Sequence, residues 1–291
     1  VKVKMLVRDK QTDHLTVLSI GHHWMQPLKF IWERLCIFIA NNFSRKNLFQ
    51  VDIANAGTDI TKLSEFQRAD VIHLHWVNQG FLSLADIDKV MHAGKPVVIT
   101  MHDQWYFTGI CHYSGNCQKY KELCESCELM SGKLLGDLAK KVFLQKEKIY
   151  SDTRLTFVGC SQWMANLAKT SKLTIGHKVV SIPNAINTEL FRPQDKRLAR
   201  EAFHLPVDKY LLLFGCQRIT DKRKGFSFLV EALQLIKQQS PDRALNIELV
   251  VVGGEAEHIR HQVPFGIFPI SYVRDPQKMV QLYNAVDLYV T

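Results

Sequence analysis

The sequence predicts an α/β protein with two domains, each built on a doubly wound parallel sheet. Three observations support this prediction. Short apolar runs rich in Val, Ile and Leu alternate along the chain with amphipathic stretches of helical period. The apolar runs alternate little with polar residues, as expected for strands that are buried on both faces. The 291 residues are too many for one typical hydrophobic core and suit two α/β domains.

The strands and helices are expected in regular succession. The predicted strands are residues 1–7, 69–75, 96–101, 155–160, 179–182, 210–216, 246–252 and 287–291. The predicted helices are residues 28–41, 84–92, 133–150, 162–170, 196–202, 226–239 and 277–285. This rhythm is typical of parallel strands joined by crossover helices.

A domain boundary is predicted where prolines recur. Pro183 follows a strand, Pro193 comes soon after, and Pro206 closes a short helix before the next strand begins. We therefore expect an N-terminal domain over residues 1–182, with a Cys-rich insertion over 109–130, and a second domain over 183–291.

Both ends of the chain are expected to fall inside a domain. The first five residues alternate Val or Met with Lys, as a strand does, and Val1 stands where a start Met would. The last five residues read as a strand with nothing after it. No secretion signal is recognisable. Because ligands of such folds bind at the carboxyl ends of strands, we expect functional residues in segments beyond both ends.

The composition is that of an ordinary globular protein, with 46% hydrophobic and 22% charged residues. No run of about 18 apolar residues occurs, so no transmembrane helix is predicted. The formal charge of +9 suits anionic partners such as nucleotide phosphates or an acidic membrane surface, although a solvated basic surface is the commoner cause. The basic residues form no array with aromatic residues, so a nucleic acid partner is not expected.

One apolar stretch, residues 28–43, covers much of the surface of a predicted helix. Such a helix can make a peripheral contact with a membrane or with a lipid-linked acceptor. Glu33 and Arg34 interrupt the stretch, and burial between a sheet and a neighbouring helix is the commoner explanation. We therefore expect this stretch to be buried.

A basic loop after one strand has the features of a phosphate site. The strand ends in Gly215, Arg218 and Lys224 lie in the loop, and Gly225 precedes the next helix. Glycine lets a ligand approach the backbone, and a helix N-terminus adds positive potential. Arg and Lys add charge-assisted hydrogen bonds to phosphate oxygens. A solvated basic loop is the alternative, and the strand–loop–helix context favours phosphate binding.

His102 and Asp103 follow another predicted strand, where side chains face a ligand crevice. His102 can bond a sugar hydroxyl or a reacting phosphate, and its protonation is tunable near neutral pH. Asp103 can orient it or cap the next segment, and a purely structural histidine is the alternative. His73 and His75 are a parallel case one strand earlier; alternation places them on one face, and at least one is expected to pack rather than react.

Two shorter signals complete the candidate cleft. Gly253, Gly254 and Glu255 end a strand, where two glycines allow a tight turn beside a ligand. Asn184 lies at the domain junction, where a plain turn is the alternative.

Four of the seven cysteines, Cys111, Cys117, Cys124 and Cys127, fall within 17 residues. Without a secretion signal a reducing compartment is expected, so metal binding is favoured over disulfides. The closing C-x-x-C is a common zinc spacing, and four thiolates complete a tetrahedral structural site. Two disulfides or four unrelated thiols are the alternatives.

Together these segments resemble the retaining GT-B glycosyltransferases of family 4, and within it the bacterial exopolysaccharide enzymes of the colanic-acid type. The resemblance covers nearly the whole chain and rests on order and spacing. Its segments are residues 73–78 (HLHWVN), 100–105 (TMHDQW), 111–117 (CHYSGNC), 182–184 (IPN) and 220–225 (TDKRKG).

The resemblance implies two Rossmann-like domains facing a cleft, both incomplete in this chain. It implies that Arg218 and Lys224 bind the diphosphate of a UDP- or GDP-linked sugar, and that His102 lies near the transferred sugar with Asp103 beside it. The family's N-terminal glycine loop and its E-x7-E segment are expected outside this chain. No cofactor is expected for catalysis, and zinc only for structure.

The implied activity is that of a hexosyltransferase acting with retention on a glycan or lipid-linked oligosaccharide, in bacterial cell-surface polysaccharide synthesis. A cytoplasmic protein, peripheral at the inner face of the plasma membrane, is expected. Another GT-B enzyme, such as a nucleotide-sugar 2-epimerase, is one alternative. A catalytically inactive, zinc-stabilised binding protein is the other.

Overall fold

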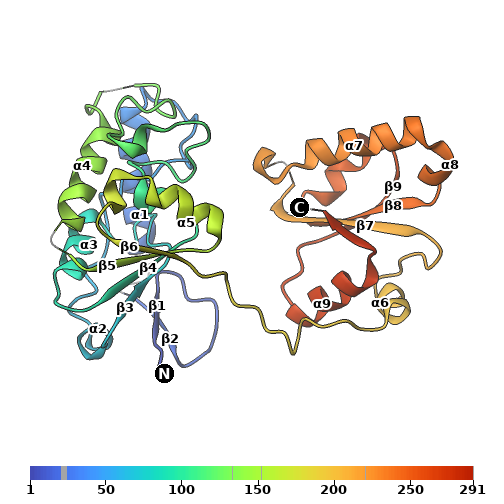
Figure 1. Cartoon of the computed structure of the whole chain (residues 1–291), viewed down its shortest axis with the longest axis horizontal. Coiled ribbons are helices and arrows are strands. Elements are labelled where there is room, and N and C mark those ends of the chain that lie inside the picture. Colours follow the sequence, from blue (N-terminus) through green and yellow to red (C-terminus); the bar gives the residue numbers. More distant parts are fainter. Residues whose placement is uncertain (21–24, 133, 152, 220, 291) are drawn as a thin grey trace. The chain divides into compact units, whose positions relative to one another are not determined.

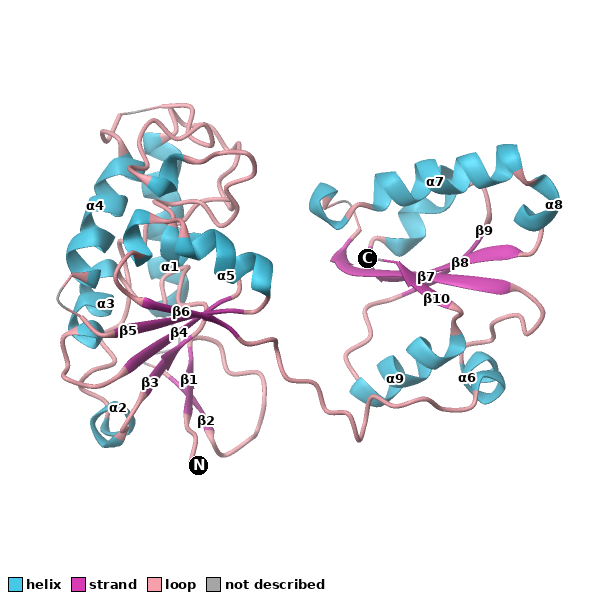
Figure 2. Cartoon of the chain, in the orientation of Figure 1, coloured by secondary structure: helices cyan, strands magenta, loops and turns pink. Residues whose placement is uncertain are grey.

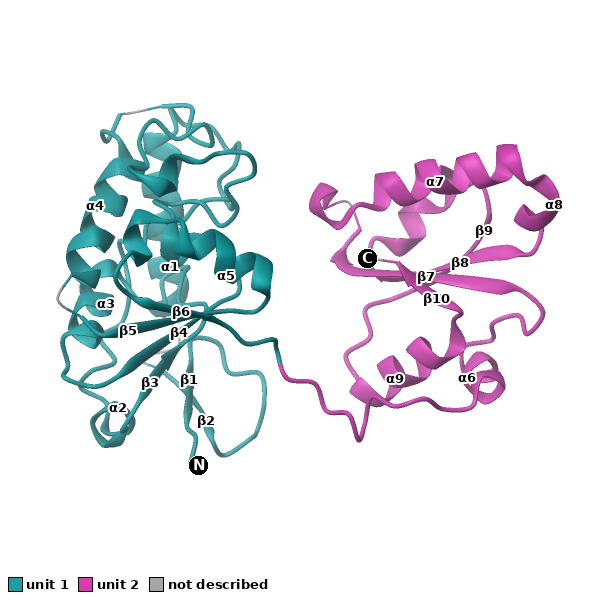
Figure 3. Cartoon of the chain, viewed as in Figure 1, with its two compact units in different colours: residues 1–184 teal, residues 185–291 magenta. Residues whose placement is uncertain are grey.

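The computed structural model describes residues 1–20, 25–132, 134–151, 153–219 and 221–290. It contains two compact α/β units (Figures 1 and 3). Unit 1 is Val1–Asn184 and unit 2 is Ala185–Thr291, so the division falls at 184/185, beside the 182/183 boundary expected from the prolines.

The main sheet of unit 1 has four parallel strands. Their order is β3 (Ile72–Leu74), β4 (Val97–Met101), β5 (Leu155–Gly159) and β6 (Lys178–Ser181). Because the spatial order follows the chain order, right-handed crossovers place the connecting helices on one face, as Figure 2 shows. These helices are α3 (Leu84–Met91), α4 (Leu138–Tyr150) and α5 (Gln162–Lys169).

The rest of unit 1 precedes this sheet in the chain. β1 (Met5–Val7) pairs with β2 (Val17–Ser19) in a separate parallel sheet, and α1 (Met25–Ala40) and α2 (Ser64–Arg68) follow. A cavity of about 350 Å³ is lined by residues of both β1 and β3.

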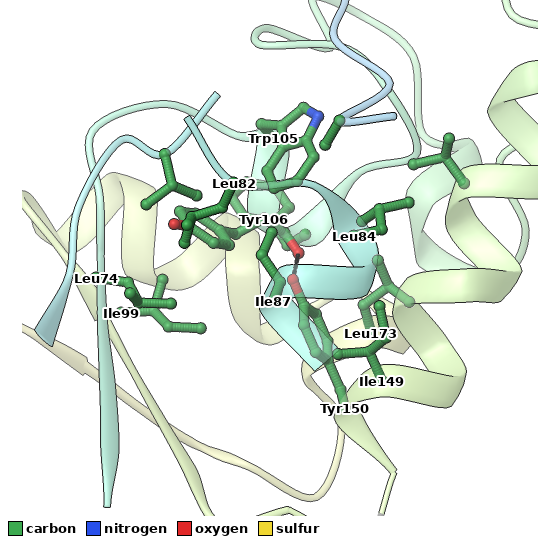
Figure 4. Close-up of a cluster of buried hydrophobic side chains, with 14 of the residues drawn as sticks. Leu74, Leu82, Leu84, Ile87, Ile99, Trp105, Tyr106, Ile149, Tyr150 and Leu173 are labelled. Carbon is green, nitrogen blue, oxygen red and sulfur yellow. Dashed lines mark hydrogen bonds between the residues drawn. The ribbon is translucent and has the colours of Figure 1, made fainter. Parts of the chain in front are cut away.

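The core of unit 1 includes the aromatic segment that follows β4. Trp105, Tyr106 and Phe107 form a 3₁₀ turn and are at most 2% exposed. Figure 4 shows Tyr150 of α4 beside Tyr106, and the Tyr150 hydroxyl donates to the Tyr106 carbonyl at 3.1 Å. The segment that leaves the sheet after β4 is therefore anchored to α4.

Unit 2 has one parallel sheet in the order β10 (Leu288–Val290), β7 (Tyr210–Arg218), β8 (Ile247–Gly254) and β9 (Gly266–Ile270). The chain moves from β7 to β8 and β9, then returns to the other side of β7 as β10. This reversal places helices on both faces of the sheet (Figure 2). They are α7 (Phe226–Gln239) and α8 (Pro241–Ala244) on one face, and α6 (Lys196–Ala202) and α9 (Pro276–Ala285) on the other.

The side chains of β7 confirm that this strand is buried on both faces. Leu211 and Leu213 join a core that includes Leu282 of α9, whereas Phe214 joins a second core with Leu233 of α7. Alternate residues thus enter opposite layers, which explains the continuous apolar sequence of the strand.

Several expected bounds differ from the structure. β2 and β9 were not expected, because β2 has only three residues and β9 contains Pro269, which an edge strand tolerates. α4 begins at Leu138 because Gly136 has a φ of +79° and the Asp137 side chain accepts from the Lys140 amide at 3.1 Å. Residues 133 and 291, at the ends of a predicted helix and a predicted strand, lie outside the described residues.

The expectation that residues 28–43 are buried holds for only part of the stretch, since Ile37 and Ala40 are buried but one apolar face of the helix is not. Within α1, Glu33 and Arg34 are buried, whereas the apolar side chains Leu28, Ile31, Trp32 and Leu35 are 44–58% exposed. The two charged residues face inward because they bind groups of the following loop, and the opposite face of the helix is left to solvent. In the described ranges, no helix combines the length and apolarity needed to cross a bilayer.

Candidate functional site

Three side chains of unit 1 follow its parallel strands at the same point. His75, His102 and Cys160 are the first residues after β3, β4 and β5. Because these strands are parallel and adjacent, their carboxyl ends meet at one edge of the sheet. That edge is where open α/β sheets bind their ligands.

His102 is held at both of its ring nitrogens. His102 Nε2 lies 2.9 Å from His75 Nδ1, and His102 Nδ1 lies 3.5 Å from the Cys160 sulfur. His73 lies behind this pair, with its ring centroid 4.2 Å from that of His75 and its Nε2 2.7 Å from the Thr100 hydroxyl. The two strand histidines share a face, as their alternation predicts.

The surroundings of these rings favour neutral imidazoles. Burial lowers the pKa of His73, and the nearby His102 lowers it further. Burial also lowers the pKa of His75, with additional effects from His73 and His102. The lowered pKa values of His73 and His75 therefore favour their neutral rings, which can both accept and donate hydrogen bonds.

Asp103 has a different position from its neighbour His102. Its carboxylate accepts from Trp76 Nε1 at 2.9 Å and from the Trp105 amide at 2.9 Å, and it lies 2.7 Å from His112 Nδ1. The side chain is 7% exposed. Asp103 therefore caps the segment after β4 and ties it to β3 and to the Cys-rich insertion, which is one of the two roles expected from the sequence.

The basic loop of unit 2 lies at the point where the strand order reverses. β7 has β10 on one side and β8 on the other, and the chain leaves β7 through this loop to enter α7. Such a switch point opens a crevice between neighbouring strand ends. Gly225 adopts a left-handed φ of +75° directly before α7, so the loop turns sharply onto the helix N-terminus.

Arg218 and Lys224 lie at the two ends of this loop with exposed side chains. In the part of the chain that the structure describes, neither forms a salt bridge. Their neighbour Arg223 does, with Asp221 at 2.7 Å. Lys224 is near enough to Asp221 to contribute to lowering the pKa of that carboxyl, after the larger effect of Arg223. Two cations at a helix N-terminus thus remain available to an anion such as a diphosphate.

The glycines at the ends of β7 and β8 have a packing role. The pairing register shifts between Gly215 and Arg218, so β7 bulges over the end of β8. Gly253 has a φ of +140°, and a Cβ there would lie 1.9 Å from the Cys216 carbonyl oxygen. A Cβ on Gly254 would lie 3.0 Å from the Gln217 carbonyl oxygen. These glycines accommodate the neighbouring strand, a reason that the sequence did not reveal.

The remaining predicted residues lie at turns. Glu255 has a left-handed φ of +70° and begins the 3₁₀ segment after β8. Asn184 is exposed and is the last residue of unit 1. Thr220, part of the resembling segment 220–225, lies outside the described residues.

The four clustered cysteines carry free thiols. Burial raises the pKa of Cys111 to about 12 and that of Cys124 to about 11, and other thiols of the group add to both shifts. The Gly109 amide donates to the Cys124 sulfur at 3.2 Å, a contact that also stabilises metal-bound thiolates. No set of three His, Cys, Asp or Glu side chains in the described ranges is grouped as metal ligands, so zinc binding stays a prediction.

The strand-end rule could have found residues that the sequence analysis passed over. Cys160 follows β5 just as His102 follows β4, yet it was not weighed as a site residue. His112, which follows Cys111 in the chain, contacts Asp103. Only the fold brings these pairs together.

Comparisons with known proteins give matches among solved structures. No protein-family model matches the sequence. No curated protein matches it either. Sucrose-phosphate synthase from Thermosynechococcus elongatus aligns with 76% of the chain at 18% identity and a TM-score of 0.48. Alpha,alpha-trehalose 6-phosphate synthase from Burkholderia multivorans aligns with 96% of the chain at 10% identity and a TM-score of 0.53.

The second alignment spans almost the whole chain and agrees with the parallel sheets described above. The chain has the GT-B fold. It spans 49% of the sucrose-phosphate synthase and 65% of the trehalose 6-phosphate synthase. At these identities the likeness is one of fold.

Proposed function

We propose that this protein is a glycosyltransferase that moves a sugar from a UDP- or GDP-linked donor to a glycan or a lipid-linked oligosaccharide. The observation that carries the proposal is the placement of Arg218 and Lys224 at the switch point of unit 2, in a chain of GT-B fold. The resemblance to bacterial exopolysaccharide enzymes supports a role in cell-surface polysaccharide synthesis at the inner face of the plasma membrane.

The two cations suit the chemistry of the leaving group. When the bond between the anomeric carbon and the phosphate oxygen breaks, its electron pair stays on the diphosphate. Charge-assisted bonds from Arg218 and Lys224, with the N-terminus of α7, would stabilise that developing charge. The acceptor hydroxyl then forms the new bond to the anomeric carbon on the same face, and its proton passes to the departing phosphate oxygen. This sequence retains the anomeric configuration.

His102 is proposed to contact the transferred sugar. His75 and Cys160 fix the ring at its two nitrogens, so the imidazole is oriented before any ligand arrives. A ring so placed can exchange one of these partners for a sugar hydroxyl. Asp103 contributes by fixing the adjoining loop rather than by touching the sugar.

The test is donor binding and turnover by the full-length protein, with UDP- and GDP-sugars measured by calorimetry and product mass. We expect one donor to bind, with slow hydrolysis to the nucleoside diphosphate and no epimer. Lys224→Ala should lower kcat/KM for the donor by about 10²-fold, the usual effect of removing one donor to a developing charge.

Lys237 provides a matched control for Lys224. It is a basic residue in the last turn of the same helix, about 17 Å from the N-terminus of that helix. Lys237→Ala should leave kcat/KM unchanged. Near-normal turnover by Lys224→Ala would show that Lys224 does not stabilise the leaving diphosphate. Conversion of the donor to its epimer would show that the protein is an epimerase and not a transferase.

A further inference from the structure

The inner face of helix α1 buries a charged pair beside Ile37 and Ala40, while its outer face exposes a row of large apolar side chains. The buried face carries Glu33 at 0% and Arg34 at 6% exposure. Arg34 Nη2 lies 3.1 Å from Asp52 Oδ2, and Glu33 Oε1 accepts from the Ile53 and Ala54 amides at 3.0 and 2.6 Å. These bonds fix the rotation of the helix about its axis, so its outer face is not exposed by chance.

The outer face of α1 is a continuous apolar stripe. It consists of Leu28, Ile31, Trp32 and Leu35, with exposed fractions of 55%, 58%, 55% and 44%. Their spacing of three and four residues places them in one row along the helix. Phe43, 62% exposed, follows shortly after the helix ends. Solitary exposed apolar side chains are common, but a row of this length marks an interaction surface.

The charges beside the stripe select the partner. Between residues 25 and 50 the exposed charged side chains are Arg45 and Lys46, and both are basic. Lys29 is half-buried, and its Nζ donates to the Thr58 hydroxyl oxygen at 2.5 Å. The one acid of this segment, Glu33, is buried. A row of Leu, Ile and Trp that is followed in the chain by exposed cations is typical of helices that lie in the interface of an anionic bilayer.

We propose that the α1 stripe docks this protein on the surface of a membrane that contains anionic lipids. The helix lies parallel to the membrane, its apolar row enters the boundary between headgroups and acyl chains, and Arg45 and Lys46 contact lipid phosphates. Trp32 suits this position, because indole rings favour the headgroup level. The proposal stands whether or not the protein transfers sugars, since its test measures binding to lipid alone.

The experiment is flotation of the full-length protein with vesicles of phosphatidylcholine, either alone or with about one third phosphatidylglycerol. Wild-type protein should float with the anionic vesicles and much less with the neutral ones. The double variant Ile31→Ser, Trp32→Ser should lower the partition coefficient more than 10-fold on anionic vesicles, because both side chains would lose their burial in lipid. Arg45→Gln with Lys46→Gln should weaken binding to anionic vesicles alone, in a salt-dependent manner.

Trp163→Ser is the matched control, because Trp163 is 60% exposed on α5 of the same unit. It should bind vesicles like the wild type, and all variants should unfold at similar temperatures because the replaced side chains are exposed. Absence of wild-type flotation at 0.1 M salt, or unchanged flotation of the double variant, would overturn the proposal. A dimer that the double variant converts to monomer, without lipid binding, would assign the stripe to a second copy of the chain instead.

Discussion

Glu33 is a buried acid whose environment favours the protonated form. Burial is the largest cause, the neighbouring Asp52 carboxylate adds to it, and together they raise the pKa of Glu33 to about 8 despite the opposing Arg34. Its ordinary value is 4.5. Between pH 4.5 and about pH 8, Glu33 keeps its proton in the folded protein but has lost it in the unfolded chain. Stability therefore falls as pH rises from 4.5 to 8.

Glu33→Gln should remove this dependence. The amide oxygen can still accept from the Ile53 and Ala54 amides, and no ionisable proton remains. We expect similar stabilities for variant and wild type at pH 5, and a variant more stable on the order of 3 kcal/mol at pH 8.5. Urea unfolding across this pH range measures the difference. Parallel curves for the two proteins would show that Glu33 titrates normally.

Lys146 is a buried base that anchors the aromatic segment. Its Nζ donates to the carbonyls of Trp105, Thr108 and Gly109 at 2.5, 3.2 and 2.9 Å, and it lies 3.3 Å from the centroid of the Trp105 ring. Burial lowers the pKa of Lys146 from 10.5 to about 7, although nearby Cys124 and Cys111 oppose the shift. Because the folded state releases this proton first, stability should rise between pH 7 and 10.5.

Lys146→Met should destabilise unit 1 by about 3 kcal/mol at pH 7, because buried carbonyls lose their donor. The variant should also lack the rise in stability above pH 7. Thermal unfolding at pH 7 and pH 9.5 tests both parts, with the exposed Lys148→Met as control. A variant as stable as the wild type would mean that water molecules donate to the Trp105, Thr108 and Gly109 carbonyls in place of Lys146.

Individual site residues were predictable where a strand-end position fixed them, and were not where a contact across the fold decides the role. The sequence predicted that His102 follows a parallel strand, and the structure places it directly after β4. The cap that Asp103 forms on the Trp105 amide is local and was expected, whereas its contacts with Trp76 and His112 join segments that are far apart in sequence. Gly253 was expected beside a ligand, but its missing Cβ leaves room for the Cys216 carbonyl.

At the scale of the element, the Cys-rich insertion offers a direct test. We expect the full-length protein to bind one zinc ion through the four cysteines, because a loop of this kind gains order from a tetrahedral site. Elemental analysis should find about one zinc per chain, and Cys117→Ser with Cys127→Ser should lose it and melt at lower temperature.

Cys36→Ser is a suitable control, since Cys36 lies on α1 outside the insertion. It should keep the metal. If the wild-type protein contains no zinc and chelators do not change its melting temperature, the four cysteines are ordinary thiols. That result would agree with the absence of a ligand grouping among the described side chains.

Helix α1 shows what element patterns leave undetermined. Its periodicity predicted a helix, and the structure confirms one at Met25–Ala40. The pattern did not determine which face points inward, since the usual preference for burying apolar residues is outweighed here by the bonds of Arg34 to Asp52, Leu48 and Val51. Partners from a later loop cannot be identified from the helix sequence alone.

For the whole molecule, the α/β class and the parallel sheets followed from the sequence and are confirmed. Continuous apolar strands separated by amphipathic helices leave few other folds available. The strand order was not predictable, because short strands such as β2 and β9 give weak signals. That order matters for function, since it places the basic loop of unit 2 at a reversal.

The pairing of β10 with β7 joins segments that lie at opposite ends of unit 2 in the sequence. The crevice at the reversal therefore has only one wall until residues 288–290 have left the ribosome and docked. During synthesis, Arg218 and Lys224 emerge long before that second wall exists. An anion site at this reversal would thus form only after β10 has docked and the sheet is complete.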